Sequence, residues 1–179
     1  MSEDEKRFSS IYDESRQHVW AYVISRGGRR VVEEVVSETF TIAWKRLADL
    51  PPQPLPWLLG VARNVLRENY RAEMRREEFA AELRERALPP QADVADDVAE
   101  RQAALRALAA LPEDERELLI LVSWHGLSPR EAAKVVGCSA ATFRVRLHRA
   151  RRRLQRELDR PTDPRPVRPR VGMIREEMP

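Results

Sequence analysis

The sequence predicts an all-α protein of two small helical bundles joined by a flexible linker, with a helix-turn-helix in the second bundle. Apolar residues recur at helical spacing in both halves, and no segment alternates persuasively as a strand does. The helical pattern lapses at 88–100, where two prolines and four acidic residues disfavour a packed core. We therefore expect bundles at 1–76 and 101–158, a linker at 77–100, and a disordered tail rich in proline and arginine at 159–179.

Three helices are expected in the first bundle. The first, 8–25, has apolar residues at roughly helical spacing and ends at the pair Gly27-Gly28. The second, 31–50, carries a wide apolar stripe of Val32, Val35, Val36, Thr39, Phe40, Ala43, Trp44 and Leu47. Four prolines within 50–56 exclude a regular helix there, so the third helix is expected at about 56–76.

The third helix combines an aromatic start with a basic side. Its apolar positions are Trp57, Leu58, Val61, Val65 and Tyr70. Its polar side carries Arg63, Asn64, Arg67, Arg71, Arg75 and Arg76. Trp57 by itself is typical of a core residue. Beside a proline-rich loop and a basic helix, it is also suited to framing a pocket for unstacked bases.

The stretch 126–158 has the local signals of a helix-turn-helix. Ser128 is suited to capping a helix, Pro129 suits the first helical position, and Glu131 completes a capping box. Residues 137–139 (Gly-Cys-Ser) form a turn of the length that joins two helices at a steep angle, and the serine is suited to capping the second helix. Two further helices, at 102–111 and 113–124, are expected to complete the second bundle.

The second helix of this motif has two distinct faces. Its apolar stripe consists of Phe143, Leu147, Ala150 and Leu154. The opposite side holds Thr142, Val145, His148, Arg149, Arg152 and Arg156. Between Ser139 and Leu158, seven arginines accompany one acid, Glu157. A helix held by its apolar side that presents arginines from the other has the geometry of a recognition helix in the major groove, whereas a solvated basic face is the alternative.

Composition narrows the class of protein. Charged residues make up 34% of the chain but the net charge is only +3, so the separation of basic and acidic blocks matters more than the total. The single cysteine, Cys138, excludes an intrachain disulfide, and with three histidines it shows no metal-ligand spacing. No catalytic motif, signal peptide or membrane-spanning run is recognisable. We expect a cytoplasmic protein that is not an enzyme, does not insert into a membrane, and takes no cofactor, metal or small-molecule substrate.

Three segments, in this order, resemble the extracytoplasmic-function group of sigma-70 family RNA polymerase sigma factors. Segment 31–47, VVEEVVSETFTIAWKRL, resembles the region that binds the clamp coiled coil of the polymerase. Segment 56–71, PWLLGVARNVLRENYR, resembles the part that melts and reads the −10 promoter element, and 111–154 resembles the region that reads the −35 element. The resemblance, over about 8–158, implies an alternative sigma factor that joins core RNA polymerase and directs promoter-specific initiation, with an anti-sigma factor as a further partner.

The resemblance also implies roles for individual residues. Those expected at the −35 element are Thr142, on the DNA backbone, and Arg144, Val145, His148 and Arg149, on the bases. At the −10 element the resemblance places Asn64 in a pocket for a flipped base, and the aromatic start and basic side of the third helix add Trp57, Arg63 and Arg67. Those expected to bind the polymerase are Glu34 and Glu38, although acids near the start of a helix also favour its dipole.

Two other classes of protein remain alternatives. An autonomous DNA-binding regulator of the LuxR-like kind also carries a helix-turn-helix, but it usually has a sensor domain, and 8–76 has the pattern of a second DNA-facing bundle. An adaptor that binds only proteins would leave the arginine face of the last helix without a role.

Overall fold

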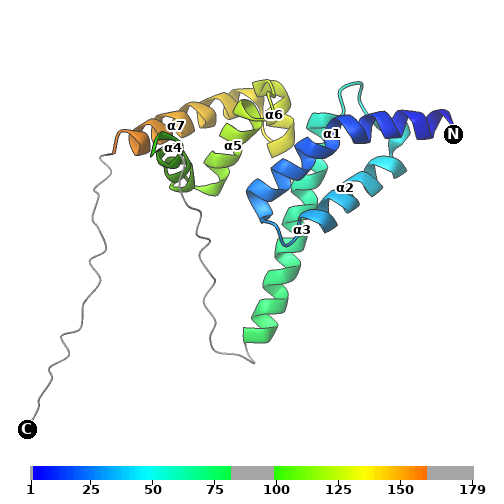
Figure 1. The fold of residues 1–179 in the computed structure, drawn as a ribbon, viewed down its shortest axis with the longest axis horizontal. Coiled ribbons are helices and arrows are strands. Elements are labelled where there is room, and N and C mark those ends of the chain that lie inside the picture. The colour runs from blue at the N-terminus through cyan, green and yellow to red at the C-terminus, as the bar shows by residue number, and fades with distance from the viewer. Residues whose placement is uncertain (1, 82–98, 161–179) are drawn as a thin grey trace, which may run out of the picture.

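The structure, a computed structural model, describes residues 2–81 and 99–160 (Figure 1). In these ranges every regular element is a helix, which confirms the predicted all-α class. The elements are α1 (Glu3–Gly27), α2 (Val32–Lys45), the 3₁₀ turn η1 (Leu47–Asp49), α3 (Leu55–Ala81), α4 (Ala99–Ala109), α5 (Glu113–Ser123), α6 (Pro129–Val136) and α7 (Ala140–Leu158). Residues 82–98 of the expected linker and 161–179 of the expected tail lie outside the described ranges.

Helix α1 begins earlier than the apolar pattern predicts. Ser2 and Glu5 form a capping box, in which the Ser2 N–H donates to Glu5 Oε2 over 2.7 Å and the Glu5 N–H donates to Ser2 Oγ over 3.2 Å. This first turn is charged and exposed, so hydrophobic periodicity carries no sign of it. The helix ends where predicted, because Gly28 takes a φ of 74°, which favours glycine.

The first bundle buries the predicted apolar stripes of α1, α2 and α3 against one another. The buried core includes Val19, Tyr22, Val23, Val35, Phe40, Ala43, Leu58, Leu59, Ala62 and Val65. Each large apolar side chain buried in this way contributes about 1.5–3 kcal/mol of transfer free energy. This burial fixes α3, and with it the proline loop that precedes it, against α1 and α2.

Three expectations for the first bundle are wrong. Trp44 is 45% exposed, because it lies at the rim of the bundle, where its ring meets Phe8 edge-on at 5.1 Å. Tyr70 is 65% exposed, and α3 runs on beyond α1 and α2 in Figure 1. Helix α2 ends at Lys45, and the chain then tightens into η1, whose Leu47 is buried.

The second bundle confirms the predicted helix-turn-helix through its caps. Ser128 and Glu131 exchange both hydrogen bonds of a capping box, at 2.8 and 3.3 Å, with Pro129 in the first turn of α6. Gly137 ends α6 in the left-handed conformation, with φ 72°. The Ser139 hydroxyl then accepts a hydrogen bond from the N–H of Thr142 over 3.0 Å and caps α7.

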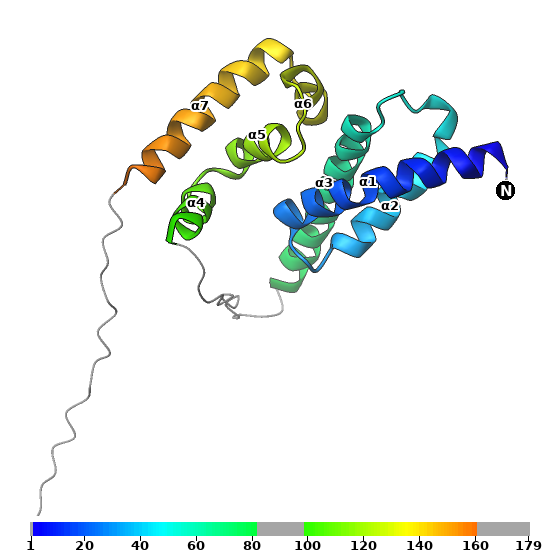
Figure 2. The same cartoon turned by 45° about the horizontal axis from the view of Figure 1, so that its top comes forward.

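The two bundles pack against each other (Figure 2). Helix α6 lies along α3, and α5 approaches α1. The approach of α6 to α3 is close at Gly60, where an added Cβ would lie 4.0 Å from the Cα of Val135. Buried apolar residues of both bundles form one continuous cluster. The sequence pattern does not predict this contact between the bundles.

Candidate nucleic-acid and polymerase interfaces

Helix α7 presents all the residues expected at the −35 element on its exposed side. Phe143, Leu147 and Ala150 of the apolar stripe are buried, and Leu154 is half-buried. On the other side, Thr142, Arg144, Val145, His148 and Arg149 are all exposed. Val145 is an apolar residue on this face and is 53% exposed.

The arginines of α7 divide into two groups. Arg146 and Arg153 turn back toward α5, where they lie 3.7 Å from Asp114 and 3.1 Å from Glu115. The buried apolar stripe holds α7 on the bundle, and these partly exposed ion pairs leave the two guanidinium groups engaged within it. Arg144 and Arg149 are exposed on the outward side. The helix can therefore offer cations to a partner without losing the contacts that position it.

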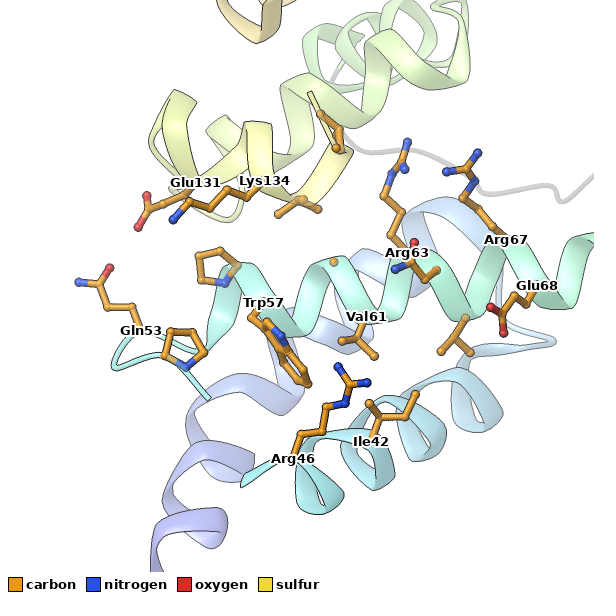
Figure 3. A pocket seen from close by; sticks show the side chains of 18 of the residues that line it. Ile42, Arg46, Gln53, Trp57, Val61, Arg63, Arg67, Glu68, Glu131 and Lys134 are labelled. Carbon is orange, nitrogen blue, oxygen red and sulfur yellow. The ribbon is translucent and has the colours of Figure 1, made fainter. Parts of the chain in front are cut away.

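The residues expected at the −10 element lie together in one groove. Trp57, Arg63, Asn64 and Arg67 of α3 line a cavity of about 1030 Å³, together with Arg46 and residues of the proline loop (Figure 3). Trp57 is half-buried and Asn64 and Arg67 are exposed, so an aromatic face, an amide and cations share one space. This set is suited to stacking an unpaired base and binding its backbone. The opposite wall comes from α6, through Glu131, Lys134 and other residues, as Figure 3 shows.

Arg63 is already bound within the protein. Its Nε donates a hydrogen bond to Oε1 of Glu117 over 2.9 Å, and its Nη2 donates to Oε2 over 3.4 Å. Glu117 also accepts a hydrogen bond from the Tyr22 hydroxyl over 2.6 Å, and burial together with the Glu117 carboxylate raises the pKa of Tyr22 well above its usual value. Sequence reasoning missed Glu117. Its signal was a carboxylate four residues before Leu121, on the apolar side of α5, where an acid needs a buried partner.

The two residues expected to bind polymerase are exposed on α2 but are not among the side chains that line the groove between α1 and α2. Glu34 and Glu38 lie beside a groove of about 970 Å³ between α1 and α2. The side chains that line this groove are Phe8, Tyr12, Arg16, Gln17, Trp20, Glu33, Val36, Ser37, Phe40, Thr41 and Trp44. The sequence did not predict this aromatic lining, because it placed Trp44 only on the apolar stripe of the second helix.

Two further results concern the described residues alone. No group of three or more histidine, cysteine or acidic side chains there is arranged to hold a metal ion. None of the described helices is long and apolar enough to cross a membrane.

Comparison with known proteins agrees with the helix-turn-helix of the second bundle. A family profile described as sigma-70, region 4, matches residues 101–154. The protein named "Probable RNA polymerase sigma factor RfaY" of Xanthomonas campestris pv. campestris is 37% identical over 134 residues, which cover 70% of this chain and 34% of that protein. The chain thus spans only about a third of that relative. The ECF RNA polymerase sigma factor EcfG of Rhodopseudomonas palustris is 34% identical over 137 residues, covering 75% of each chain.

The fold has a counterpart among solved structures. The sigma factor RpoE of Bartonella quintana, solved in complex with the anti-sigma factor NepR, aligns with a TM-score of 0.67 and 26% sequence identity. The alignment covers 87% of this chain and 99% of that one. Together these likenesses define a sigma-70 type protein. The chain belongs to the extracytoplasmic-function group of the sigma-70 family of RNA polymerase sigma factors.

Proposed function

We propose that this chain is an alternative sigma factor that binds core RNA polymerase and directs promoter-specific transcription initiation. The observation that carries the proposal is the presence of two separate basic surfaces on two bundles of one chain. One is the exposed side of α7, and the other is the groove along α3. We assign residues 1–76 to the polymerase and the −10 element, and residues 101–158 to the −35 element.

The −35 element is read by α7. Arg144, His148 and Arg149 supply hydrogen-bond donors for base edges in the major groove, and Val145 is suited to meet the methyl group of a thymine. Thr142, in the first turn, contacts a phosphate, where the N-terminal end of the helix favours negative charge.

The −10 element, once melted, occupies the α3 groove. Trp57 offers a stacking face, and Asn64 can both donate to and accept from the edge of a flipped base. Arg63 and Arg67 bind the backbone of the strand. The proline loop before α3 is stiff, so it loses little conformational entropy when it orders around a base.

Core polymerase binds the α1–α2 side of the first bundle. Exposed Trp20 and Trp44, with the acids Glu34 and Glu38 beside their groove, form a mixed apolar and acidic surface suited to a protein partner. The likeness to RpoE, which was solved with NepR, supports an anti-sigma factor as a second partner of this chain. The chain acts in the cytoplasm and has no catalysis of its own, since the polymerase makes the RNA.

Reconstituted transcription tests the proposal. The purified chain is mixed with core polymerase and genomic DNA of its source, and the 5′ ends of the RNA are sequenced. We expect one shared promoter motif with core polymerase present and no RNA from the chain alone, because polymerase fixes the spacing of the two bundles and lets their contacts add. The double variant Glu34→Lys with Glu38→Lys should abolish this initiation.

Two controls complete this test. Glu3→Lys with Asp4→Lys makes the same charge reversal at exposed acids of another helix and should leave initiation intact. Circular dichroism checks that each variant keeps its helices, because a lysine at Glu34 opposes the α2 dipole. Tight binding of the free chain to a duplex operator, with no initiation when polymerase is added, would instead identify an autonomous regulator.

A further inference from the structure

Glu117 is a buried carboxylate whose partners all belong to the other bundle. It lies in α5 and is 1% exposed. Within the described residues its oxygens bind the Tyr22 hydroxyl at 2.6 Å, Arg63 Nε at 2.9 Å and Arg26 Nη1 at 3.5 Å. These three groups come from α1 and α3. The carboxylate therefore serves the contact between the bundles rather than the fold of its own bundle.

A buried ion pair of this kind adds little net stability to the arrangement of bundles in which it forms, but it makes that arrangement depend on both partners. Removing two charges from water costs nearly as much as their attraction returns, yet removing one partner leaves the other buried and unpaired. We call the arrangement in which the bundles are in contact closed, and the one in which they are apart open. In the open arrangement Arg63 and Arg26 both face water, so replacing Glu117 does not destabilise it. The closed arrangement then keeps the largely buried guanidinium of Arg63 without its carboxylate partner, whereas Arg26 retains Glu113 at 3.2 Å. The contact is thus sensitive to this one carboxylate.

The closed arrangement affects the two nucleic-acid surfaces unequally. In the closed arrangement Arg63 is bound to Glu117. Helix α6 also lies against the groove lined by Trp57 and Asn64, and Lys134 and Val135 form part of its wall. The outward residues of α7 remain exposed at the same time. Closure therefore obstructs the groove assigned to the −10 strand and leaves the −35 surface free.

We propose that Glu117 is an intramolecular competitor for the −10 strand, which binds Arg63 in the free chain and must be displaced before the α3 groove can take DNA. The proposal rests on the function proposed above, because it takes Arg63 as a DNA-binding residue. The carboxylate substitutes for a phosphate of the melted strand, and both are anions that a guanidinium binds through two hydrogen bonds. The apparent affinity of the groove is then reduced by the fraction of chains that are open.

Two measurements on the full chain test this proposal. The first is the distance between fluorophores on α1 and α7, attached through Ser9→Cys and Arg151→Cys in a Cys138→Ser background. Both labelled positions are exposed. The second is the affinity for a labelled oligo(dT) strand of about 12 nucleotides, since base stacking tolerates any sequence. Glu117→Gln, which keeps the size of the side chain, should lengthen the distance and tighten strand binding about tenfold or more.

The matched control lies one turn earlier on the same helix. Glu113 also pairs with Arg26, at 3.2 Å, but its side chain is 64% exposed. Glu113→Gln should leave the distance unchanged and alter strand binding less than about twofold, because exposed ion pairs contribute little. Arg63→Gln should open the chain like Glu117→Gln but bind the strand more weakly than Glu117→Gln does.

The outcomes separate the two proposals. If both Glu117→Gln and Glu117→Ala leave the distance and the strand affinity unchanged, Glu117 is no competitor. If Arg63→Gln opens the chain and binds the strand as tightly as Glu117→Gln, the contact between the bundles stands but the assignment of Arg63 to DNA fails. Circular dichroism checks that each variant remains folded. Tyr22→Phe removes only the hydroxyl that donates to Glu117, so it should open the chain to a smaller extent than Glu117→Gln and tests the same contact in a milder variant.

Discussion

Acidification should weaken the contact between the bundles through His125. This side chain, in the turn after α5, is 5% exposed. Its Nδ1 lies 3.3 Å from Nδ1 of His18 on α1, and its ring lies 6.0 Å from that of Tyr22. Its Nε2 is buried without a hydrogen-bond partner among the described residues. Burial, and then the neighbouring His18, lower the pKa of His125 from 6.5 to about 4.

The sign and size of the effect follow from this pKa. Where the bundles are apart, His125 regains its ordinary pKa and binds a proton more readily than in the closed arrangement. Closure is therefore unaffected well above pH 6.5 and weakens as the pH falls from 6.5 toward 4. At pH 5, about 1.5 units below the ordinary value, the loss is about 2 kcal/mol, or roughly a thirtyfold change in the ratio of open to closed chains.

The labelled chain described above measures this change. Its distance distribution is recorded at pH 7 and pH 5, and we expect a longer distance at pH 5. His125→Gln stays uncharged at both values and should remove most of the response. His148→Gln, on the exposed side of α7, changes a histidine that takes no part in the contact and should keep it. An equal pH response in the wild type and in His125→Gln would refute the reasoning.

Three further predictions concern single helices. Phe143→Ala should lower the free energy of unfolding, measured in urea, by about 3–5 kcal/mol, because Phe143 is fully buried. Val145 is exposed, so Val145→Ala should change that free energy by less than about 0.5 kcal/mol. Equal losses would contradict the assigned faces of α7. Arg149→Ala should weaken promoter use by about 1–3 kcal/mol and relax the −35 preference. Arg156 donates to a backbone carbonyl of its own helix, so Arg156→Ala should have a smaller effect. An undiminished transcript from Arg149→Ala would show that Arg149 makes no base contact. Asn64→Ala should reduce permanganate reactivity of melted −10 thymines and leave −35 duplex binding intact, and unchanged melting would make Asn64 structural.

Local signals in the sequence were sufficient to predict the helix caps and turns, whose hydrogen bonds join residues three or four positions apart. The capping box of Ser128 and Glu131, the end of α6 at Gly137 and the cap at Ser139 all form as predicted. Each depends only on neighbours within one helical turn, so residue types and spacing determine it. The same holds for the two faces of α7, since helical geometry alone decides which side chains share a face.

Side-chain exposure was predicted less well where a helix runs past its neighbours. Periodicity placed Trp44 and Tyr70 on the apolar stripes of their helices, but both are exposed. The periodicity of apolar residues shows which face of a helix is apolar. How far burial extends along that face depends on the length of the helices packed against it.

The contact between the bundles was decided by the tertiary structure alone. The sequence placed Arg63 on a basic helix and thereby suggested a nucleic-acid surface. Its ion pair with Glu117 joins positions 54 residues apart, and the hydrogen bond from Tyr22 to the same carboxylate spans 95. No periodicity links such positions, because their meeting depends on how two separately formed bundles dock. Residue types determined what each surface can bind, and the docking determined which of those surfaces is already occupied.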